Sequence, residues 1–206
     1  MERSQGYFTR EELKSSAKAS LCNHWCSSTI VCIIAITLYT APGLISEKTN
    51  VFFLLIPGPI SFGLSLYFLR LSRNERAKIT HLFQGFRHFR RTLATYLLCM
   101  LFILLWGSIL IIPGIIVSIS YSQVFFILAD NPEIPSTEVM EISKNMMQGY
   151  KWDYFLLQLS FLAWGICCIL TLGIGFFWLI PYIKTTNANF YLKVKANYNP
   201  VNFQIF

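Results

Sequence analysis

The feature that most constrains this chain is where its charged residues do not occur. Asp, Glu, Lys and Arg are absent from four long stretches that together exceed half of the 206 residues: 19–46, 49–69, 92–129 and 154–183. Soluble domains carry about 25% charged residues, whereas this chain has 13% charged and 54% hydrophobic residues. Uncharged stretches of this length are typical of segments surrounded by hydrocarbon rather than water. The sequence therefore predicts a membrane protein.

Glycines divide the two longest uncharged stretches. Pro113-Gly114 interrupts residues 92–129, and Gly173 and Gly175 interrupt residues 154–183. Because glycine allows the backbone to turn and proline ends a helix, each stretch predicts a hairpin of two helices. A limb of about 20 residues crosses the hydrocarbon. The limb after Gly114 has only about 15 residues, so a re-entrant element is an alternative to a full crossing there.

We expect an all-α polytopic membrane protein with about six transmembrane helices, arranged as three hairpins that each follow a short amphipathic helix. The chain, 1–206, forms a single membrane domain with these segments in order: a cytoplasmic amphipathic segment 1–20, hairpin 1 at 21–69 with a polar turn at 46–50, a basic cytoplasmic segment 70–91, hairpin 2 at 92–129, an acidic cytoplasmic segment 130–153, hairpin 3 at 154–192 and a cytoplasmic tail 193–206. Every Lys and Arg except Lys48 then lies toward one side, and the positive-inside rule places both termini in the cytoplasm.

The amphipathic segments have a local helix signature. Thr9 and Glu12 form a capping box before Leu13, Ala17 and Leu21, which share one helix face. Two further stripes follow helical spacing: Ile79, Leu82, Phe83 and Phe86, and then Val139, Ile142, Met146, Met147 and Tyr150. Such helices serve either as collars lying in the membrane interface or as a cytoplasmic docking surface.

The net charge of +7 is concentrated beside the predicted spans. Seven basic residues in 70–91 abut two spans, where they face anionic headgroups, so we expect lipid rather than nucleic acid as their partner. Residues 130–153 are mainly acidic, and the two segments attract each other, attract a shared partner, or are simply solvated. The candidate contacts to lipid, to another membrane protein or to a second copy of the chain are Arg87, Arg90, Arg91, Glu138, Glu141 and Trp152.

No catalytic set assembles along the chain. The uncharged stretches lack acids, bases and an interior His, so we expect no enzyme. Six cysteines are present, but four of them lie inside apolar stretches, where a reduced thiol packs as a small hydrophobe. Cys22 and Cys26 with His24 are too few ligands for a metal site. We therefore expect no metal and no cofactor.

Polar groups inside the spans have two interpretations. Gln123, Gln158, Asn187 and Asn189 are candidates to line a transport path, and the same amides are able to bond between helices as structural glue. Gly114, Ser118 and Ser122 recur every four residues, a spacing that lets a neighbouring helix approach closely, either within the chain or in a dimer. Lys184 follows the last uncharged stretch, and we expect its long side chain to reach the interface while the helix continues to about Tyr191.

Several strings resemble the signature of a bacterial integral-membrane family catalogued as domain of unknown function 975. They are Ile112-Pro113-Gly114-Ile115-Ile116, Tyr121-Ser122, Ile127-Leu128-Ala129-Asp130-Asn131-Pro132, Gly149-Tyr150-Lys151-Trp152-Asp153, Leu159-Ser160-Phe161, Leu170-Thr171-Leu172-Gly173-Ile174-Gly175, Pro181-Tyr182, Asn189-Phe190-Tyr191 and Glu12-Leu13-Lys14. The resemblance implies a multi-pass plasma-membrane protein, mostly of Gram-positive bacteria, with no assigned reaction. Val117 departs from it where many relatives have lysine, and so does Leu192-Lys193, where acidic residues are common.

Two hypotheses of function follow. The first is a non-enzymatic membrane protein that acts by binding proteins or lipids, in immunity to a secreted cell-wall hydrolase or in regulation of envelope synthesis. In size and span number the chain is also similar to the competence-induced immunity membrane protein of transformable cocci. The second is a small-molecule or lipid transporter or channel, which a water-filled path lined by the four amides would favour.

Overall fold

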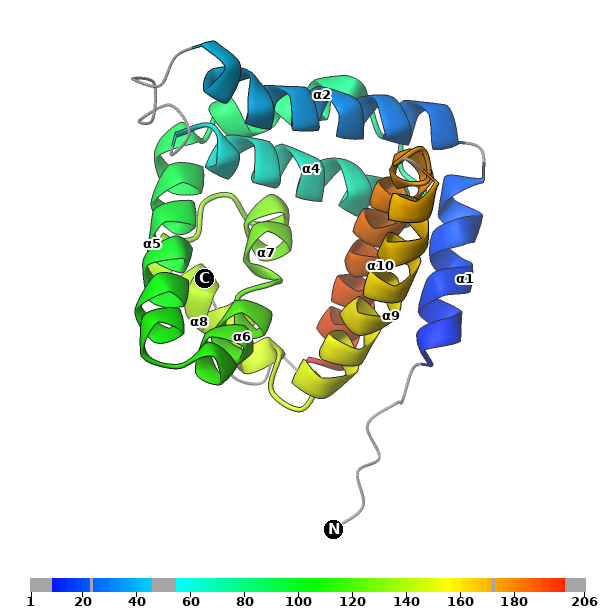
Figure 1. Ribbon diagram of the computed structural model, residues 1–206. Helices are drawn as coiled ribbons and strands as arrows, with labels where there is room; N and C mark the ends of the chain where they lie inside the picture. The colour runs from blue at the N-terminus through cyan, green and yellow to red at the C-terminus, as the bar shows by residue number, and fades with distance from the viewer. Residues whose placement is uncertain (1–8, 23, 46–54, 172, 199–206) are drawn as a thin grey trace.

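The computed structural model describes residues 9–22, 24–45, 55–171 and 173–198. These residues form nine α-helices and one 3-10 helix, without a strand (Figure 1). The elements in chain order are α1 (Arg10–Leu21), α2 (Trp25–Ile45), α4 (Pro57–Ser72), η1 (Ile79–Phe86), α5 (Phe89–Ile109), α6 (Ile111–Ser120), α7 (Val124–Asp130), α8 (Ser136–Met146), α9 (Lys151–Leu170) and α10 (Phe176–Asn197). The turn predicted at 46–50 and the end of the predicted tail lie outside the described residues.

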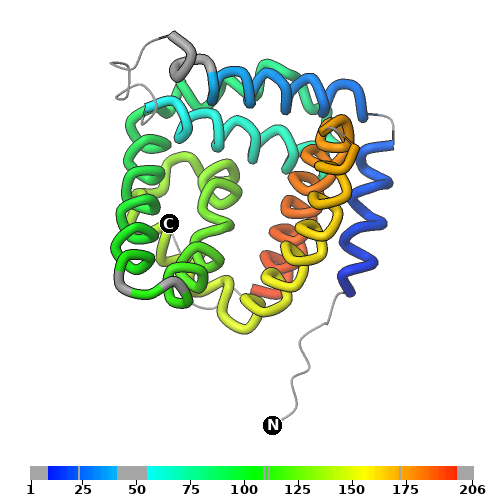
Figure 2. Tube along the Cα trace, viewed as in Figure 1, coloured from blue at the N-terminus to red at the C-terminus, as the bar shows by residue number. Residues whose placement is uncertain are grey.

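The long helices are arranged in pairs around the centre of the molecule (Figures 1 and 2). α2 contacts α4 along one edge, α5 contacts α6, and α9 contacts α10. α1 packs along α10 and is turned by 97° from α2, while α7 contacts both α4 and α8. Each pair follows a short helix, namely α1, η1 and α8, in the order that the sequence predicted.

α4 is the most enclosed of these helices, because glycines let its neighbours touch its backbone. Twelve of its 16 residues are buried. A Cβ atom at Gly63 would lie 2.0 Å from the carbonyl oxygen of Leu82 in η1. A Cβ atom at Gly85 would lie 1.9 Å from the carbonyl oxygen of Pro59. Real side chains cannot come this close to a carbonyl, so these two glycines set how tightly α4 and η1 pack.

The amphipathic helices bury most of their predicted stripes. The capping box at Thr9 and Glu12 is present, with backbone-to-side-chain bonds of 3.1 and 3.3 Å. The three stripe residues of α1 are all buried, and so are Val139, Ile142 and Met146 of α8 and Met147 directly after it. On η1, Leu82 is buried whereas Ile79, Phe83 and Phe86 are exposed. α1 and α8 therefore pack mainly onto the rest of the protein.

Three helices in the described part of the chain are long and apolar enough to cross a membrane: Phe89–Ser108, Ile112–Asp130 and Lys151–Leu170. A fourth is added if the bent pair of α1 and α2 counts as one span. In each of the three, no more than 39% of the most apolar part is buried inside the protein. Their apolar faces therefore need lipid or a partner. The structure thus supports fewer than the six predicted spans. α4 is about 24 Å long, shorter than the roughly 30 Å of hydrocarbon.

The turn predicted at Pro113-Gly114 lies a few residues earlier. Leu110 has an extended backbone and separates α5 from α6, so that Pro113 sits in the first turn of α6. The amide hydrogens of the first turn of a helix have no partner within the helix, so proline, which lacks one, is tolerated there. This explains why the turn precedes Pro113 instead of coinciding with it. Gly114 lies inside α6 against Gly107, whose Cα would be 2.8 Å from a Cβ atom added there.

The break predicted at Gly173 and Gly175 coincides with the connection between α9 and α10. Gly173 has a φ of +83°, a conformation that favours glycine. A Cβ atom on Gly175 would lie 2.5 Å from the sulfur of Cys168, so this glycine allows the connection to fold back onto α9. α10 continues to Asn197, beyond the predicted end near Tyr191.

Candidate functional site

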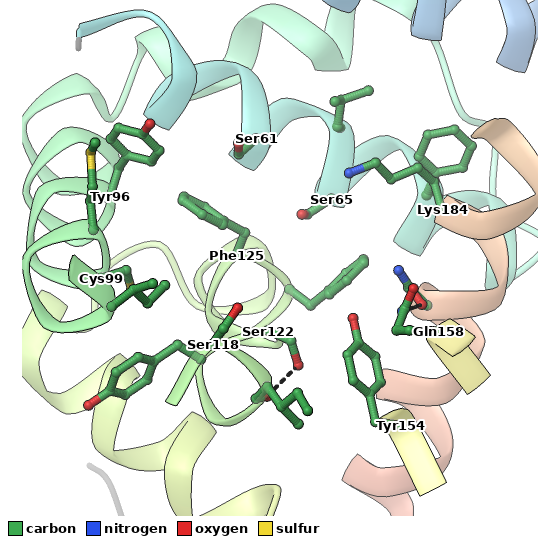
Figure 3. Close-up of a pocket in the computed structure, with 18 of the residues that line it drawn as sticks. Ser61, Ser65, Tyr96, Cys99, Ser118, Ser122, Phe125, Tyr154, Gln158 and Lys184 are labelled. Carbon is green, nitrogen blue, oxygen red and sulfur yellow. Dashed lines mark hydrogen bonds between the residues drawn. The ribbon is translucent and has the colours of Figure 1, made fainter. Parts of the chain in front are cut away.

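A cavity of about 610 Å³ lies between the helix pairs (Figure 3). Its volume falls within the range of roughly 300–1,000 Å³ that is usual for small-molecule sites. Six helices and the α6–α7 connection contribute to its wall through Ser61, Leu64, Ser65, Phe68, Tyr96, Cys99, Met100, Ile103, Leu104, Ser118, Ile119, Tyr121, Ser122, Phe125, Phe126, Tyr154, Gln158, Lys184 and Asn187.

The wall of the cavity has chemically different sides. α5 contributes mainly apolar side chains, including Met100, Ile103 and Leu104. α9 and α10 contribute Gln158, Lys184 and Asn187, and α4 adds two serines. In Figure 3 Tyr96 and Cys99 of α5 stand across the cavity from Lys184 and Gln158. A few convergent polar groups in a largely apolar cavity are the usual arrangement of a ligand site.

Lys184 lines the cavity, although the sequence did not mark it as a candidate site residue. Its side chain points into the cavity toward Ser65, rather than along the helix toward an interface (Figure 3). Lys184 lines the cavity and keeps solvent-accessible surface. One signal was present: residues after Lys184 include Thr185, Thr186 and Asn187, and so polar a stretch fits poorly against lipid. That signal places this part of α10 against protein or water.

Two of the four candidate transport-path amides line the cavity, and two do not. Gln158 Nε2 donates a hydrogen bond of 2.9 Å to Asn187 Oδ1, which joins α9 to α10 at the wall. Gln123 is fully buried, and its Nε2 donates to Ser122 Oγ at 2.9 Å. Asn189 is also buried. The four amides therefore do not form one continuous path.

The small-residue stripe does not lie on one continuous helix. α6 ends at Ser120 and α7 begins at Val124, so Ser122 falls in the connection between them. Ser118 and Ser122 line the cavity, and Ser122 Oγ donates to the carbonyl of Ile119 at 2.7 Å. Gly114 alone packs against a helix backbone. Ser118 and Ser122 thus border the cavity, whereas Gly114 packs against α5, and the three do not form one helix–helix interface.

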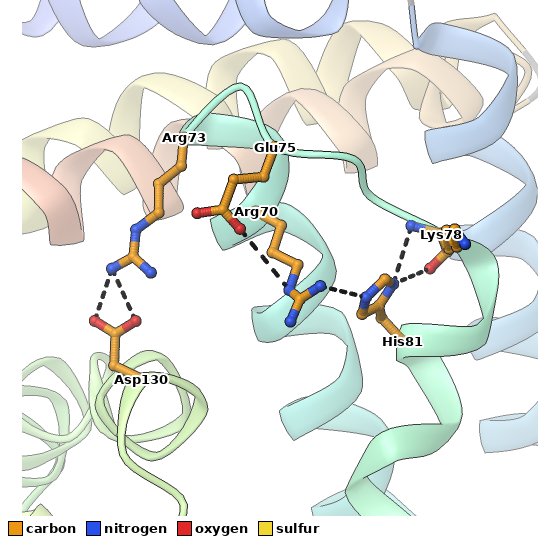
Figure 4. A network of polar contacts seen from close by, with 6 residues as sticks. All are labelled: Arg70, Arg73, Glu75, Lys78, His81 and Asp130. Carbon is orange, nitrogen blue, oxygen red and sulfur yellow. Dashed lines mark hydrogen bonds and ion pairs between the residues drawn. The ribbon is translucent and has the colours of Figure 1, made fainter.

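Asp130 at the end of α7 binds residues at the end of α4 and on α10, and Figure 4 shows its pair with Arg73. Arg73 Nη2 donates to both carboxylate oxygens at 2.8 and 2.9 Å, and the Asp130 side chain is only 6% exposed. Tyr191 Oη donates to the carboxylate at 2.7 Å and Lys195 Nζ at 2.6 Å. The sequence suggested only that Asp130 ends a helix. In the structure it ties the end of α7 to α4 and α10.

Arg70 joins the same end of α4 to η1 (Figure 4). Its Nη1 lies 2.6 Å from His81 Nε2. Because arginine has no acceptor, His81 Nε2 must accept this bond and the ring proton must lie on Nδ1. The Nδ1 atom lies 2.8 Å from the carbonyl oxygen and 3.0 Å from the backbone nitrogen of Lys78. The buried imidazole therefore holds η1 against α4.

The candidate partner contacts lie mostly on the outside. Arg87, Arg90 and Glu141 are exposed, and Glu138 is half-buried. Trp152 is exposed and stacks on Phe155. Arg91 instead forms a salt bridge of 2.8 Å with Glu133 of the same chain and donates a hydrogen bond to the carbonyl of Pro132. The basic and acidic segments do meet, but through Asp130 and Glu133 rather than through Glu138 and Glu141.

The cysteines of the described part are free thiols, of which Cys32, Cys99 and Cys168 are buried. In the described part of the chain, no three His, Cys, Asp or Glu side chains come together as a metal site. The chemistry that the cavity offers is therefore that of an ammonium, amides and hydroxyls, which are groups that bind and orient a ligand.

A family model described as "Protein of unknown function (DUF975)" matches residues 1–113 and 108–198. No curated protein and no solved structure matches the chain. Because the two matches cover nearly the whole sequence, the chain belongs to the DUF975 family.

Proposed function

We propose that this member of the DUF975 family is a non-enzymatic, multi-pass protein of the bacterial plasma membrane that holds an amphiphilic small molecule or lipid in its central cavity. The observation that supports it is the cavity of about 610 Å³, with apolar side chains on α5 and polar ones on α9 and α10. Exposed apolar residues on α5 and α9, such as Leu101 and Ile166, fit a lipid environment around it.

The test is to identify what the full-length protein retains on purification. We expect native mass spectrometry in a neutral detergent to show an added mass with one-to-one stoichiometry. Ser118→Trp fills the cavity, since Ser118 lines it, and is expected to remove this mass. Ser16→Trp on the exposed face of α1 is the control and is expected to retain it. An added mass that is equal in both variants, or absent from the unaltered protein, would contradict the proposal.

The six crossings with cytoplasmic termini belong to the same proposal. Fusions at the C-terminus test the cytoplasmic placement of that end. A green fluorescent protein fusion is expected to fluoresce, and an alkaline phosphatase fusion is expected to be inactive. Binding of another membrane protein, in immunity to a secreted cell-wall hydrolase or in control of envelope synthesis, stays a prediction. The immunity role predicts that deleting the gene for this protein increases lysis of the cells by the culture's own lytic factors.

A further inference from the structure

Lys184 carries a positive charge into the cavity without a countercharge. In the described part of the chain its ammonium makes no hydrogen bond and no ion pair, and no aspartate or glutamate lines the cavity. Every other lysine on α10 has an acidic partner: Lys193 pairs with Glu12 and Lys195 with Asp130.

An unpaired ammonium is costly away from bulk water. Ionisable residues inside membrane proteins are rare, face a cavity or the interior of the bundle, and mark the sites of substrates or ions. The charge is tolerated when a ligand or water supplies the missing interaction. Lys184 lines the cavity, and its side chain points into it (Figure 3).

A second donor lies on the same face of α10. Asn187 is three residues after Lys184, so the two side chains are neighbours along the helix. Its Oδ1 accepts the bond from Gln158 Nε2, and this fixes the orientation of the amide. The Nδ2 of Asn187 then remains a donor, and it has no acceptor in the described part of the chain. An ammonium and an amide N–H therefore face the cavity together.

The opposite side of the cavity suits an apolar group. Met100, Ile103 and Leu104 on α5 and Phe125 on α7 line it. A molecule with its polar end at Lys184 would thus place its remaining atoms among these side chains. A bare inorganic anion would leave the apolar wall in contact with water, which the hydrophobic effect disfavours.

We infer that the cavity binds an anionic amphiphile, with a carboxylate or phosphate head at Lys184 and Asn187 and an apolar chain directed toward α5. This inference rests on the proposed function and names the class of ligand. Charge-assisted hydrogen bonds are the strong ones, and an ammonium forms them with either head group. A neutral or cationic amphiphile of the same length lacks that interaction.

The experiment measures binding of radiolabelled palmitate to the full-length protein in a neutral detergent. Competitors are hexadecyl phosphate, hexadecanol and inorganic phosphate. We expect palmitate and hexadecyl phosphate to compete with each other and hexadecanol to be about 10-fold weaker or more. We expect inorganic phosphate not to compete. Lys184→Met is expected to weaken palmitate about 10-fold or more, whereas Lys184→Arg restores most of the affinity and the surface control Lys144→Met changes nothing.

The outcomes separate the two proposals. Equal affinity for palmitate and hexadecanol, abolished by Ser118→Trp and unaffected by Lys184→Met, would overturn the charge selection and leave the amphiphile cavity standing. Affinity that Ser118→Trp does not change would overturn both. Competition by hexadecanol in the unaltered protein needs no variant, so a failure of Lys184→Met to fold leaves the inference open to refutation.

Discussion

Replacing Asp130 with asparagine tests how strongly one buried carboxylate holds three helices together. Asparagine keeps the size and an acceptor for Tyr191 but removes the charge that faces Arg73 and Lys195. Removal of one partner from a buried ion pair costs roughly 3–5 kcal/mol. Arg73 and Lys195 are 32% and 46% exposed, so water screens them and we expect a loss of about 2–3 kcal/mol.

For a chain of this size, each kcal/mol lowers the unfolding midpoint by about 2–4 °C, so Asp130→Asn is expected to lower it by about 4–12 °C. Tryptophan fluorescence during heating in a neutral detergent measures the change. Glu133→Gln is the matched control, since Glu133 also makes a 2.8 Å pair, with Arg91, but its side chain is 78% exposed. We expect it to lose about 0–1 kcal/mol. Equal shifts in the two variants would refute the argument from burial.

Two further predictions concern packing and pH. Gly63→Ala forces a Cβ atom against the Leu82 carbonyl and is expected to lower the free energy of unfolding by about 3 kcal/mol or more. Gly165→Ala has open space around it and is expected to raise that free energy by about 0.5–1 kcal/mol. Thermal unfolding that ranks the two variants the other way would contradict the close packing at Gly63. The backbone N–H of Thr9 and then Lys193 lower the pKa of Glu12 below its ordinary 4.5. A lowered folded pKa means that the contribution of Glu12 is complete above the ordinary value and is lost as the pH falls through the lowered one. The hydrogen-exchange protection factors of the α1 amides are therefore expected to fall at acid pH. They are expected to change less with pH in Glu12→Gln.

Features set by neighbours in the sequence were predictable. The capping box of α1 depends only on Thr9 and Glu12, and it is present. The positions of the helices follow from the uncharged stretches, because an apolar segment has few alternatives to a helix in hydrocarbon. The break at Gly173 follows from the positive φ that glycine supplies.

Features set by the way helices face each other were not predictable. Lys184 lies at the end of an apolar stretch, where a lysine can equally reach for the interface, and only the rotation of α10 directs it inward. The turn near Pro113 was misplaced because proline fits the first turn of a helix as well as the loop before it. The partners of Asp130 come from segments 57 to 65 residues away in the sequence.

Photo-crosslinking gives the most direct test that the cavity holds the apolar chain of an acidic lipid. A palmitate analogue with a diazirine in the middle of its chain is irradiated with the protein in lipid nanodiscs, and the modified peptides are sequenced by mass spectrometry. Binding in the cavity predicts adducts at Ile103, Leu104 or Phe125 that Ser118→Trp removes. Adducts confined to outward-facing residues of α9, such as Leu162, would contradict it.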